Sequence, residues 1–555
     1  MIGDDWRRLT GAGGHPMLSY DMDSRGELGL YEHLYRCIRD DILSGTLDPN
    51  DRLPSKRRLA EHLGVSVITV EGAYRQLVAE GYAYSLPKRG FYVSELPRNA
   101  RSAARVHAAT TPADSAVVAA QRPNSAGSSA SAASSAPACF ADFTRPSLRS
   151  GSSAARLWGK ALRAALSQED EKTLFSSQPP QGSVRLRRVI AAYLRTSRGM
   201  DVDPDCIVVG AGSQILYGMI PLLAAGVAPE SVPVRIALED PGYPRLYETY
   251  RMLGVPVVPV PLDVEGMDVA ALGRTEATVA HVMPSHQFPT GRVTSVSRRY
   301  ELLGWASRRP GRLIVEDDYD WEFRFAGRPI PSLQSIEAEG RVIYLSTFSK
   351  SLSAALRIAF AVVPHHLIER LRHAANLDPS ALFGLFAGTV SSVDQIALAR
   401  LLESGDYERH LNRYRKESRD VRDALVRALE SAFPKGDVAI EEADSGLHFV
   451  LALRVESTAE PVVAPAAPEP ATEPSAESAV AEAELAIARE ALKLGVRLAP
   501  LSSYAMGEGG GASGGPDGWA RFVMQYDGLE PGLVESAAQA IRRAVQAANC
   551  GALPR

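Results

Sequence analysis

The chain has 555 residues, of which 45% are hydrophobic and 23% are charged, and its formal net charge at pH 7 is −4. This composition is typical of a globular protein, and the length is enough for three or more domain-sized units. The small net charge excludes an affinity for nucleic acid spread over the whole surface, so any DNA contact must come from local basic clusters.

The spacing of the cysteines and the lengths of the apolar runs indicate the cellular compartment of the protein. Cys37, Cys139, Cys206 and Cys550 are scattered without C-x-x-C or histidine-rich spacing, so neither a metal site nor a disulfide framework is predicted. No apolar run approaches the roughly 18 residues needed to span a bilayer, and no basic-then-apolar leader begins the chain. We therefore expect a cytoplasmic, nucleoid-associated protein without a membrane partner.

Three short helices are predicted near the N-terminus. Residues 1–27 are glycine-rich and polar, and we expect them to be flexible. From Leu30, apolar residues recur at every fourth position until Gly45, which predicts an amphipathic helix. Ser55 and Ser66 are placed to cap a second and a third helix, separated by a turn of helix-turn-helix length.

A basic hairpin is predicted after the third helix. Residues 82–93 alternate apolar side chains around a Pro-Lys-Arg-Gly tip, and further basic residues gather at the start of the second helix. A third helix that presents Thr69 and Arg75 outward beside such a hairpin fits major-groove insertion with phosphate anchoring. The predicted DNA-binding residues are Arg52, Ser55, Lys56, Arg57, Ser66, Thr69, Tyr74, Arg75, Lys88, Arg89 and Gly90.

The sequence from Arg52-Leu-Pro-Ser55 through Leu-Gly-Val-Ser66 to Glu80-Gly81-Tyr resembles the winged-helix signature of GntR transcription factors. The resemblance implies a winged helix-turn-helix over residues 28–97 that binds double-stranded operator DNA. A helical protein–protein module with a solvated basic face is the alternative.

A linker is predicted after the hairpin. Residues 98–139 are dominated by Ala, Ser, Thr and Pro, a composition typical of disordered segments. A flexible coil of about 40 residues spans on the order of 35 Å, which leaves the DNA-binding head loosely tethered and free to belong to another subunit.

The second module begins at Phe140. Strand and helix patterns alternate up to Pro364, which predicts a mostly parallel sheet. Apolar runs end in polar or glycine-rich turns at residues 210–214, 239–245 and 284–291, and sites in open α/β sheets form at such strand ends. The N–H groups of the helix that follows Gly212 would receive a phosphate.

Lys350 is the central residue of the predicted site. It stands among small hydroxyl residues directly after an apolar strand, and a pocket that lowers the pKa of a lysine lets it form a Schiff base with a cofactor aldehyde. Thr347 and Ser349 could hold a phosphate through their hydroxyls, and Arg357 through a charge-assisted fork. Taken alone, the pattern also fits a solvated loop lysine.

A cluster of acids follows another predicted strand. The apolar run 313–315 leads into residues 316–320, Glu-Asp-Asp-Tyr-Asp. A carboxylate there can pair with the pyridine nitrogen of pyridoxal 5′-phosphate, and a tyrosine can bond the 3′ oxygen of its ring. An acidic strand end that faces solvent or a metal is the alternative.

The turns at residues 210–214, 239–245 and 284–291 are followed by the acids at 316–320 and by the segment around Lys350. This order is similar to that in the aminotransferase-like half of MocR-type regulators. In this branch of the GntR family a winged helix-turn-helix is fused to a type I aminotransferase fold. The resemblance implies a multidomain chain with a mainly α head and an α/β aminotransferase-like domain over residues 140–550. That domain would divide into a large subdomain at about 200–370 and a smaller α+β subdomain at about 371–550. We expect mobile insertions at residues 456–484 and 507–518, and a domain-swapped homodimer.

The resemblance also implies roles for single residues. Lys350 would form the Schiff base, Asp317 would pair with the pyridine nitrogen, and Tyr319 would bond the 3′ oxygen. Arg245 and Arg521 fall where relatives bind an effector carboxylate, although a salt-bridged surface arginine is the alternative for Arg521. The other implied cofactor-binding residues are Gly212, Ser213, Gln214, Tyr243, His286, Thr347, Ser349 and Arg357.

Three features depart from the enzymes of this fold. Phe288 replaces a common asparagine, Ala359 replaces a glycine, and residues 174–182 lack a tyrosine that a neighbouring subunit often lends to the phosphate. This depletion favours a pyridoxal-phosphate-dependent regulator of a metabolic operon that senses a small amino compound or the vitamer itself. The alternative is a working aminotransferase with an accessory DNA-binding domain.

Overall fold

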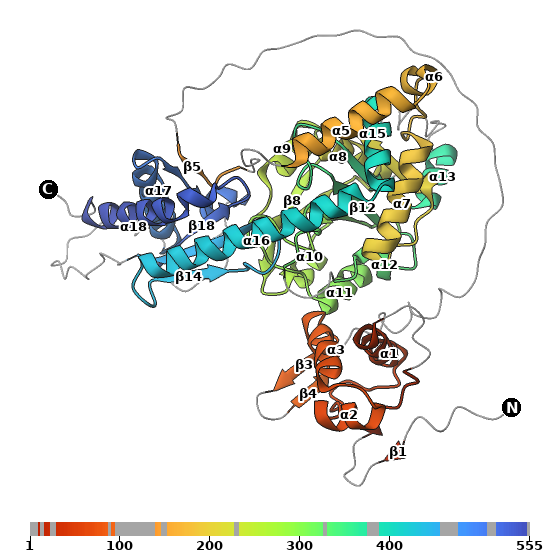
Figure 1. The fold of residues 1–555 in the computed structure, drawn as a ribbon, viewed down its shortest axis with the longest axis horizontal. Helices are drawn as coiled ribbons and strands as arrows, with labels where there is room; N and C mark the ends of the chain where they lie inside the picture. Colours follow the sequence, from red (N-terminus) through yellow and green to blue (C-terminus); the bar gives the residue numbers. More distant parts are fainter. Residues whose placement is uncertain are drawn as a thin grey trace.

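The computed structural model describes residues 9–10, 16–22, 29–86, 90–94, 139–145, 153–226, 232–325, 330–374, 388–455, 476–507 and 518–551. Figure 1 shows a small N-terminal head beneath a larger body, and the body divides into a large and a small subdomain. Most of the predicted linker, residues 98–138, lies outside the described residues, as do 456–475 and 508–517 within the two predicted insertions.

The head is a three-helix unit with a hairpin, as predicted. Its elements are α1 (Leu30–Ser44), α2 (Lys56–Leu63), α3 (Val67–Ala79), β3 (Ala83–Leu86) and β4 (Gly90–Val93). The four-residue repeat in α1 buries Leu34, Ile38 and Ile42, and the helix ends at Gly45, whose φ of 79° is the left-handed conformation that glycine adopts without strain.

Part of the N-terminal segment packs against the head, so the expectation of flexibility is wrong for residues 16–22. β1 (Leu9–Thr10) and β2 (Pro16–Met17) form a short antiparallel pair. Leu18 is buried in the core of the head, and the hydroxyl of Tyr20 donates to a carboxylate oxygen of Asp41 at 2.7 Å. A leucine and a tyrosine in a glycine-rich stretch are enough to dock it, because both bury apolar area.

The large subdomain contains an eight-stranded sheet in the order β6-β13-β12-β11-β10-β7-β8-β9. The run from β12 to β8 is parallel, β13 is antiparallel to both neighbours, and β9 is antiparallel to β8, which confirms the mostly parallel sheet. In sheet order the strands are β6 (Ile207–Gly210), β13 (Ala359–Val362), β12 (Val342–Thr347), β11 (Leu313–Asp317), β10 (Val279–Val282), β7 (Ile236–Asp240), β8 (Val257–Asp263) and β9 (Gly266–Met267).

Helices cover both faces of this sheet (Figure 1). Alternate residues of one strand enter different cores, as the pleat requires: Ile207 and Val209 pack in one hydrophobic cluster and Val208 in another. The helices of the large subdomain are α5 (Ser153–Gln168), α6 (Glu171–Phe175), α7 (Val184–Arg198), α8 (Ser213–Ala225), α9 (Pro244–Met252), α10 (Val269–Arg274), α11 (Val296–Ser307), α12 (Leu333–Ile336), α13 (His365–Ala374) and α15 (Ser392–Glu403).

The small subdomain is a four-stranded antiparallel sheet backed by two helices. The strands, in sheet order, are β14 (Val438–Glu441), β15 (His448–Arg454), β18 (Trp519–Gln525) and β17 (Ala499–Pro500). The helices are α17 (Ala476–Lys493) and α18 (Val534–Gly551), and β16 (Val496–Arg497) pairs with β5 (Ala141–Asp142) from the start of the second module.

The predicted insertion at 456–484 is wrong in its last part. Residues 476–484 begin α17, and Glu484 within it is fully buried, where its carboxylate accepts hydrogen bonds from the backbone N–H groups of Ser502 and Arg521. The Ala/Glu-rich composition that suggested a loop also favours helix, and packing on the sheet decided the outcome.

α16 (Asp406–Ala432) is a helix of 27 residues that joins the two subdomains. Tyr407 and Leu411 near its start belong to the core of the large subdomain, whereas Leu425 and Leu429 near its end belong to that of the small one. Figure 1 shows this helix crossing the body.

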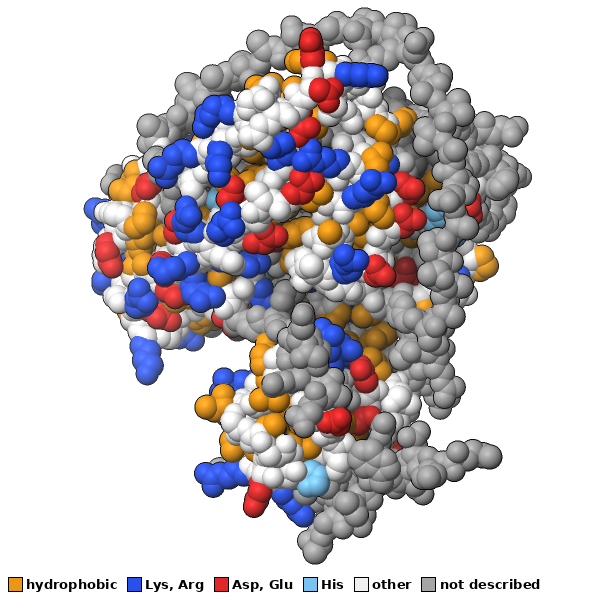
Figure 2. All heavy atoms as spheres, turned by 45° about the vertical axis from the view of Figure 1, so that its right-hand side comes forward, with side chains coloured by type: hydrophobic (Ala, Val, Ile, Leu, Met, Phe, Trp, Pro, Cys, Tyr) orange, Lys and Arg blue, Asp and Glu red, His pale blue; other side chains and the backbone are white. Residues whose placement is uncertain are grey.

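The head contacts the body at the start of α11. Val296, Tyr300 and Ile330 of the body share one hydrophobic cluster with the head, including Tyr82, and each of these four side chains is buried. Figure 2 shows the head projecting from the body, on whose visible face basic and acidic side chains are interspersed. Among the described residues, no helix is both long and apolar enough to cross a membrane.

Candidate functional site

The carboxyl ends of neighbouring strands bring the predicted Schiff-base lysine to the acidic cluster. β11 and β12 are parallel, with Asp317 opposite Leu345. Lys350 follows the end of β12, and its Nζ lies 5.8 Å from the ring centroid of Tyr319, which follows β11. Lys350 is half-buried, so it can be reached from solvent while it contacts an aromatic face.

A cationic cradle lies at the N-terminus of α8. The guanidinium of Arg357 donates to Oε1 of Gln214 and packs against Gly212, where a Cβ atom would lie only 2.2 Å from Nη2 of the arginine. Gly212 has a φ of +92°, so two independent constraints favour glycine there. Ser213 begins the 13-residue helix α8, whose first N–H groups have no partner within the helix. Backbone N–H groups at a helix N-terminus beside an arginine suit a phosphate.

The hydroxyl residues beside Lys350 form a local network. Thr347 Oγ1 donates to Oγ of Ser349 at 2.9 Å, and the N–H of Ser349 donates to Oγ1 of Thr347 at 3.1 Å. Thr347 is buried and Ser349 is half-buried, so of the two hydroxyls that of Ser349 is the more accessible to a bound group.

Asp317 is buried, and a tyrosine that the sequence analysis missed holds its carboxylate. The hydroxyl of Tyr217 donates to Oδ2 of Asp317, and Nε2 of His281 lies 3.6 Å from the same oxygen. Burial, followed by the charge of Asp317, raises the pKa of Tyr217 well above its ordinary value. Tyr217 is one helical turn after Ser213 on α8, so the helical period could have indicated it once Ser213 was singled out.

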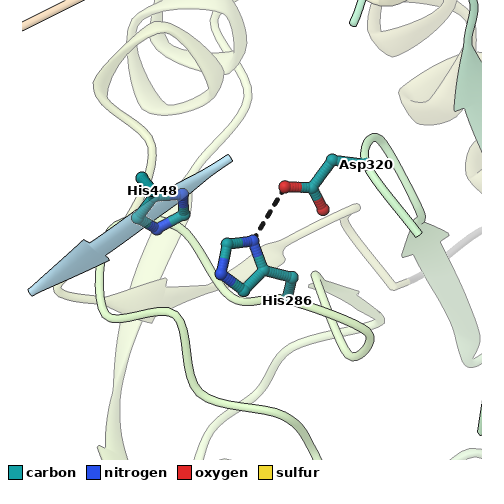
Figure 3. Close-up of side chains that lie close together, drawn as sticks. All are labelled: His286, Asp320 and His448. Atoms are coloured by element: carbon teal, nitrogen blue, oxygen red, sulfur yellow. Dashed lines mark hydrogen bonds and ion pairs between the residues drawn. The ribbon is translucent and has the colours of Figure 1, made fainter. Parts of the chain in front are cut away.

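His286 is one of three buried side chains that converge beside Tyr319 (Figure 3). Its Nδ1 and a carboxylate oxygen of Asp320 are 2.8 Å apart, and the hydroxyl of Tyr319 is 3.4 Å from the same nitrogen. The ring of His448 stands 4.2 Å away, centroid to centroid. Burial, followed by the charges of His286 and Lys350, lowers the pKa of His448 well below its ordinary value, so this imidazole is neutral at physiological pH. Asp320 belongs to the acid cluster predicted after the strand, whereas His448 was not predicted, because nothing near it in the chain reveals a partner in another element.

Aromatic rings line the approach to Tyr243. Phe288 contacts Tyr243 and Tyr504 edge to face, at centroid distances of 5.6 and 5.3 Å. The predicted effector contact Arg245 is exposed on α9. The second one, Arg521 on β18, is buried, and its Nε pairs with Oε1 of Glu441 at 3.3 Å. Arg521 is thus salt-bridged, as the alternative expected, but it is buried rather than on the surface.

The head presents most of the predicted DNA-binding residues on or near its surface. Ser55 and Ser66 accept from the N–H groups of Arg58 and Thr69, so both serines cap helices as predicted. Arg52 and Arg57 are exposed, whereas Lys56 and Arg75 both pair with Glu71. Thr69 is half-buried near the N-terminus of α3, and Gly90 has a φ of +109° beside Arg52.

The prediction that Tyr74 contacts DNA is wrong. Its side chain has no exposed surface, its hydroxyl donates to the carbonyl of Pro54 at 2.8 Å, and its ring packs against Phe91. Val70, Tyr74 and Leu77 recur at helical spacing on α3, so the helical period places this tyrosine on the face that packs into the core of the head. Lys88 and Arg89 of the predicted wing tip lie outside the described residues.

Comparisons with known proteins match both halves of the chain. Residues 30–93 match the family of bacterial regulatory proteins of the gntR type, and residues 150–524 match aminotransferases of class I and II. Among solved structures, the α-aminoadipate aminotransferase LysN of Thermus thermophilus has a TM-score of 0.56 at 24% identity, covering 74% of this chain and 93% of that one. The multiple substrate aminotransferase of Thermococcus profundus has a TM-score of 0.57 at 20% identity, covering 75% and 93%. These likenesses establish the fold.

Several relatives span both halves. The HTH-type transcriptional regulator YhdI of Bacillus subtilis is 34% identical over 455 residues, 80% of this chain and 88% of the relative. The probable rhizopine catabolism regulatory protein MocR of Rhizobium meliloti is 32% identical, covering 78% and 83%. The pyridoxine biosynthesis regulator PdxR of Corynebacterium glutamicum is 31% identical, covering 75% and 81%.

Fold and site together define a class: a winged-helix DNA-binding head fused to a body with the aminotransferase class I and II fold. Within that class, the chain belongs to the MocR subfamily of the GntR transcriptional regulators. Its function is therefore the regulation of transcription through the winged-helix head, and amino-group transfer with an accessory head is the less supported alternative.

Proposed function

We propose that this regulator holds pyridoxal 5′-phosphate at Lys350. Its affinity for operator DNA would change when a small amino compound, or the vitamer itself, occupies the same pocket. The observation that carries the proposal is that Lys350 and a buried carboxylate lie at the carboxyl ends of the adjacent strands β12 and β11, with a cationic cradle at the carboxyl end of β6, two strands from β12. Such an arrangement is what a phosphorylated pyridine aldehyde requires.

The residues fit the cofactor group by group. The Nζ of Lys350 is the amine that would hold the aldehyde, and the buried Asp317 is the partner for a protonated ring nitrogen. Gly212, Ser213 and Arg357 would bind the phosphate, since the missing Cβ of Gly212 lets the guanidinium lie against the helix N-terminus. When bound, the cofactor supplies an aldehyde that exchanges one amine for another. Tyr319 stands beside Lys350, where its phenol can orient the ring oxygen.

An absorption spectrum and a covalent trap test this cofactor site. The purified full chain with added pyridoxal 5′-phosphate should show a visible-violet band, and borohydride reduction should leave the phosphopyridoxyl group on the peptide that contains Lys350. The variant Lys350→Ala should lose both signals, whereas Lys435→Ala, which removes an exposed lysine of the small subdomain, should keep them. An adduct absent from the Lys350 peptide of the wild type would overturn the proposal.

We expect an effector carboxylate to bind at Arg245 of the large subdomain and Arg521 of the small one. Arg245 is exposed on α9, and its charge acts on Tyr243. Arg521 holds Glu441 in this structure, and a ligand carboxylate would compete with that glutamate for the guanidinium. For the ligand to regulate, it must bind one arrangement of the protein better than the other.

A charge interaction acts between the pocket region and the third helix of the head. Burial raises the pKa of Glu80, which caps the C-terminus of α3, while Arg324 is among the cations that lower it. Arg324 is four residues after Asp320, on the segment that leaves the pocket. A shift of this segment would therefore be felt at the end of the helix that reads DNA.

The proposed DNA contacts are the exposed basic and hydroxyl residues of the head, with Lys88 and Arg89 at the wing. We also propose a cytoplasmic homodimer with exchanged heads, since a linker of about 40 residues reaches on the order of 35 Å. Amino-group turnover and operator binding, measured on one preparation, separate the regulator from an enzyme. Fast multiple turnover without sequence-preferring DNA retention would favour the enzyme, and sedimentation gives the oligomeric state.

A further inference from the structure

Three buried metal-ligating side chains meet between the two subdomains (Figure 3). His286 stands on the loop after β10, Asp320 on the loop after β11, and His448 is the first residue of β15. Their exposed fractions are 2%, 2% and 3%. The candidate ligand atoms, one from each residue, all lie within 4.8 Å of one another.

The two imidazoles each keep a bare nitrogen inside this cluster. Nδ1 of His286 bonds the Asp320 carboxylate. The Nε2 atoms of both histidines are buried and have no hydrogen-bond partner among the described residues. An unpartnered nitrogen in a buried space is unfavourable unless a cation or a donor meets it, and an ion at Nε2 of His286 requires the Asp320 carboxylate to leave Nδ1 and turn toward that ion.

We propose that His286, Asp320 and His448 bind one divalent first-row transition-metal ion, with Zn²⁺ as the ion that two imidazoles and a carboxylate suit best. Imidazole and carboxylate oxygen together are a recurrent zinc set, and three protein ligands leave a fourth position for water or a small molecule. The absence of C-x-x-C and histidine-rich spacing predicted no metal site, but these ligands come from three separate elements and no local spacing could reveal them.

The geometry is close to what such an ion needs. Zinc–nitrogen distances of about 2.0–2.1 Å place tetrahedral ligands about 3.3 Å apart, so the ligand atoms must approach by at most about 1.5 Å. His286 is already fixed, because a Cβ on Gly446 would lie 1.8 Å from its Cε1 and one on Gly291 would lie 3.3 Å from its Nε2. The movement that brings the ligand atoms together would therefore come from His448 and Asp320.

The position of the site gives the ion a structural consequence. Two ligands belong to loops of the large subdomain and the third to a strand of the small one, so a bound ion would join the subdomains directly. The hydroxyl of Tyr319 is 3.4 Å from Nδ1 of His286, so the ion would lie next to the cofactor pocket. The proposed covalent partner of the cofactor is Lys350, which is not one of the three metal ligands.

Zn²⁺ titration of the full chain tests the site. The chelator-treated, dialysed protein is titrated with Zn²⁺ against a chromophoric chelator, with and without pyridoxal 5′-phosphate, and Co²⁺ serves as a spectroscopic probe of the ligand set. We expect one equivalent to bind, with a tetrahedral Co²⁺ spectrum free of thiolate bands and a higher Tm in the presence of Zn²⁺. His448→Ala and Asp320→Asn should each weaken binding by more than about tenfold.

The matched control removes a half-buried histidine of the head, outside the proposed site. His33→Ala abolishes a histidine whose Nε2 is 3.7 Å from Sγ of Cys37, and it should leave Zn²⁺ binding unchanged. Asp320→Asn preserves shape and carries the test if His448→Ala does not fold. A wild type that binds no stoichiometric Zn²⁺, as expected if only water bridges the two nitrogens, overturns the proposal. Zn²⁺ binding that survives both variants, or that disappears only in His33→Ala, also overturns the proposal. Because the titration is also run without the cofactor, its failure is distinct from failure of the Lys350 site.

Discussion

Gly212 is the residue on which the proposed phosphate cradle depends. An added Cβ would lie 2.2 Å from the Arg357 guanidinium, and a φ of +92° is strained for any other residue. We expect Gly212→Ala to move the arginine and to weaken pyridoxal 5′-phosphate binding by at least about tenfold. A tenfold loss corresponds to about 1.4 kcal/mol of binding free energy. A fluorescence or absorbance titration measures this loss. Gly254→Ala, at a positive φ with open space around it, is the control for backbone strain alone.

Glu239 gives the protein a pH dependence that can be measured. Burial raises the pKa of this carboxyl to about 8, so the folded chain holds a proton that the unfolded chain releases near 4.5. The stabilisation from this group is complete below 4.5 and is lost as the pH rises through about 8. Glu239→Gln keeps the shape and cannot ionise. We therefore expect the variant to match the wild type near pH 4.5 and to exceed it by a few kcal/mol above pH 8, at about 1.4 kcal/mol per pKa unit. Urea unfolding at both pH values checks this, and equal free energies of unfolding at high pH would contradict it.

The positions of some residues could be predicted from the sequence, and those of others could not. Lys350 and Asp317 were predictable because strand ends are visible in the apolar pattern, and the structure brings both ends together. The predicted DNA contact of Tyr74 was wrong because Val70 and Leu77, one turn away on either side, put it on the buried face of α3. His448 was missed because its partners, His286 and Asp320, belong to loops of another subdomain.

Among the elements, α3 was predicted from its cap, and the cap is the part to test. Ser66 accepts from the N–H of Thr69 at 3.0 Å and contacts the Thr69 hydroxyl at 2.8 Å. Ser66→Ala should cost about 1 kcal/mol of local stability, the usual loss for such a cap. Hydrogen exchange in the full chain should show faster exchange in the first turn of α3. Ser44→Ala, in the last turn of α1, is the control and should leave α3 unchanged.

Element bounds followed the sequence where caps or glycines mark them, as at Ser55, Ser66 and Gly45. They failed where composition alone was used. The Ala/Glu-rich stretch before Glu484 was expected to be a loop, but α17 packs on β18 and buries that glutamate. Tertiary packing overrides composition in such segments because most helical stability comes from the buried face.

At the scale of the whole molecule, the docking of the head on α11 could not be read from the sequence. Val296 is buried beneath the head, and Tyr300 packs in the same hydrophobic cluster as Tyr82. Both body residues fit an ordinary amphipathic helix, so their contact with the head is visible only in three dimensions.

Disrupting this contact should uncouple the head from the pocket. Val296→Asp places a charge in the shared hydrophobic cluster, where burial of an unpaired carboxylate is costly. We expect faster proteolysis of the linker and a smaller effect of the effector on operator affinity, with the cofactor spectrum unchanged. Ser297→Asp adds the same charge at a half-buried neighbour on α11 and should behave as wild type. An unaltered effector response in Val296→Asp would show that coupling takes another route.

The length of α16 has a mechanical meaning. Its 27 residues make a rod of about 40 Å, anchored at one end by Tyr407 and at the other by Leu429. A tilt of about 5° at one anchor displaces the far end by about 3.5 Å, because the rod is about 40 Å long. Slight pivoting around a small molecule would thus be magnified into a movement as large as a side chain, without any bond in the rod having to break.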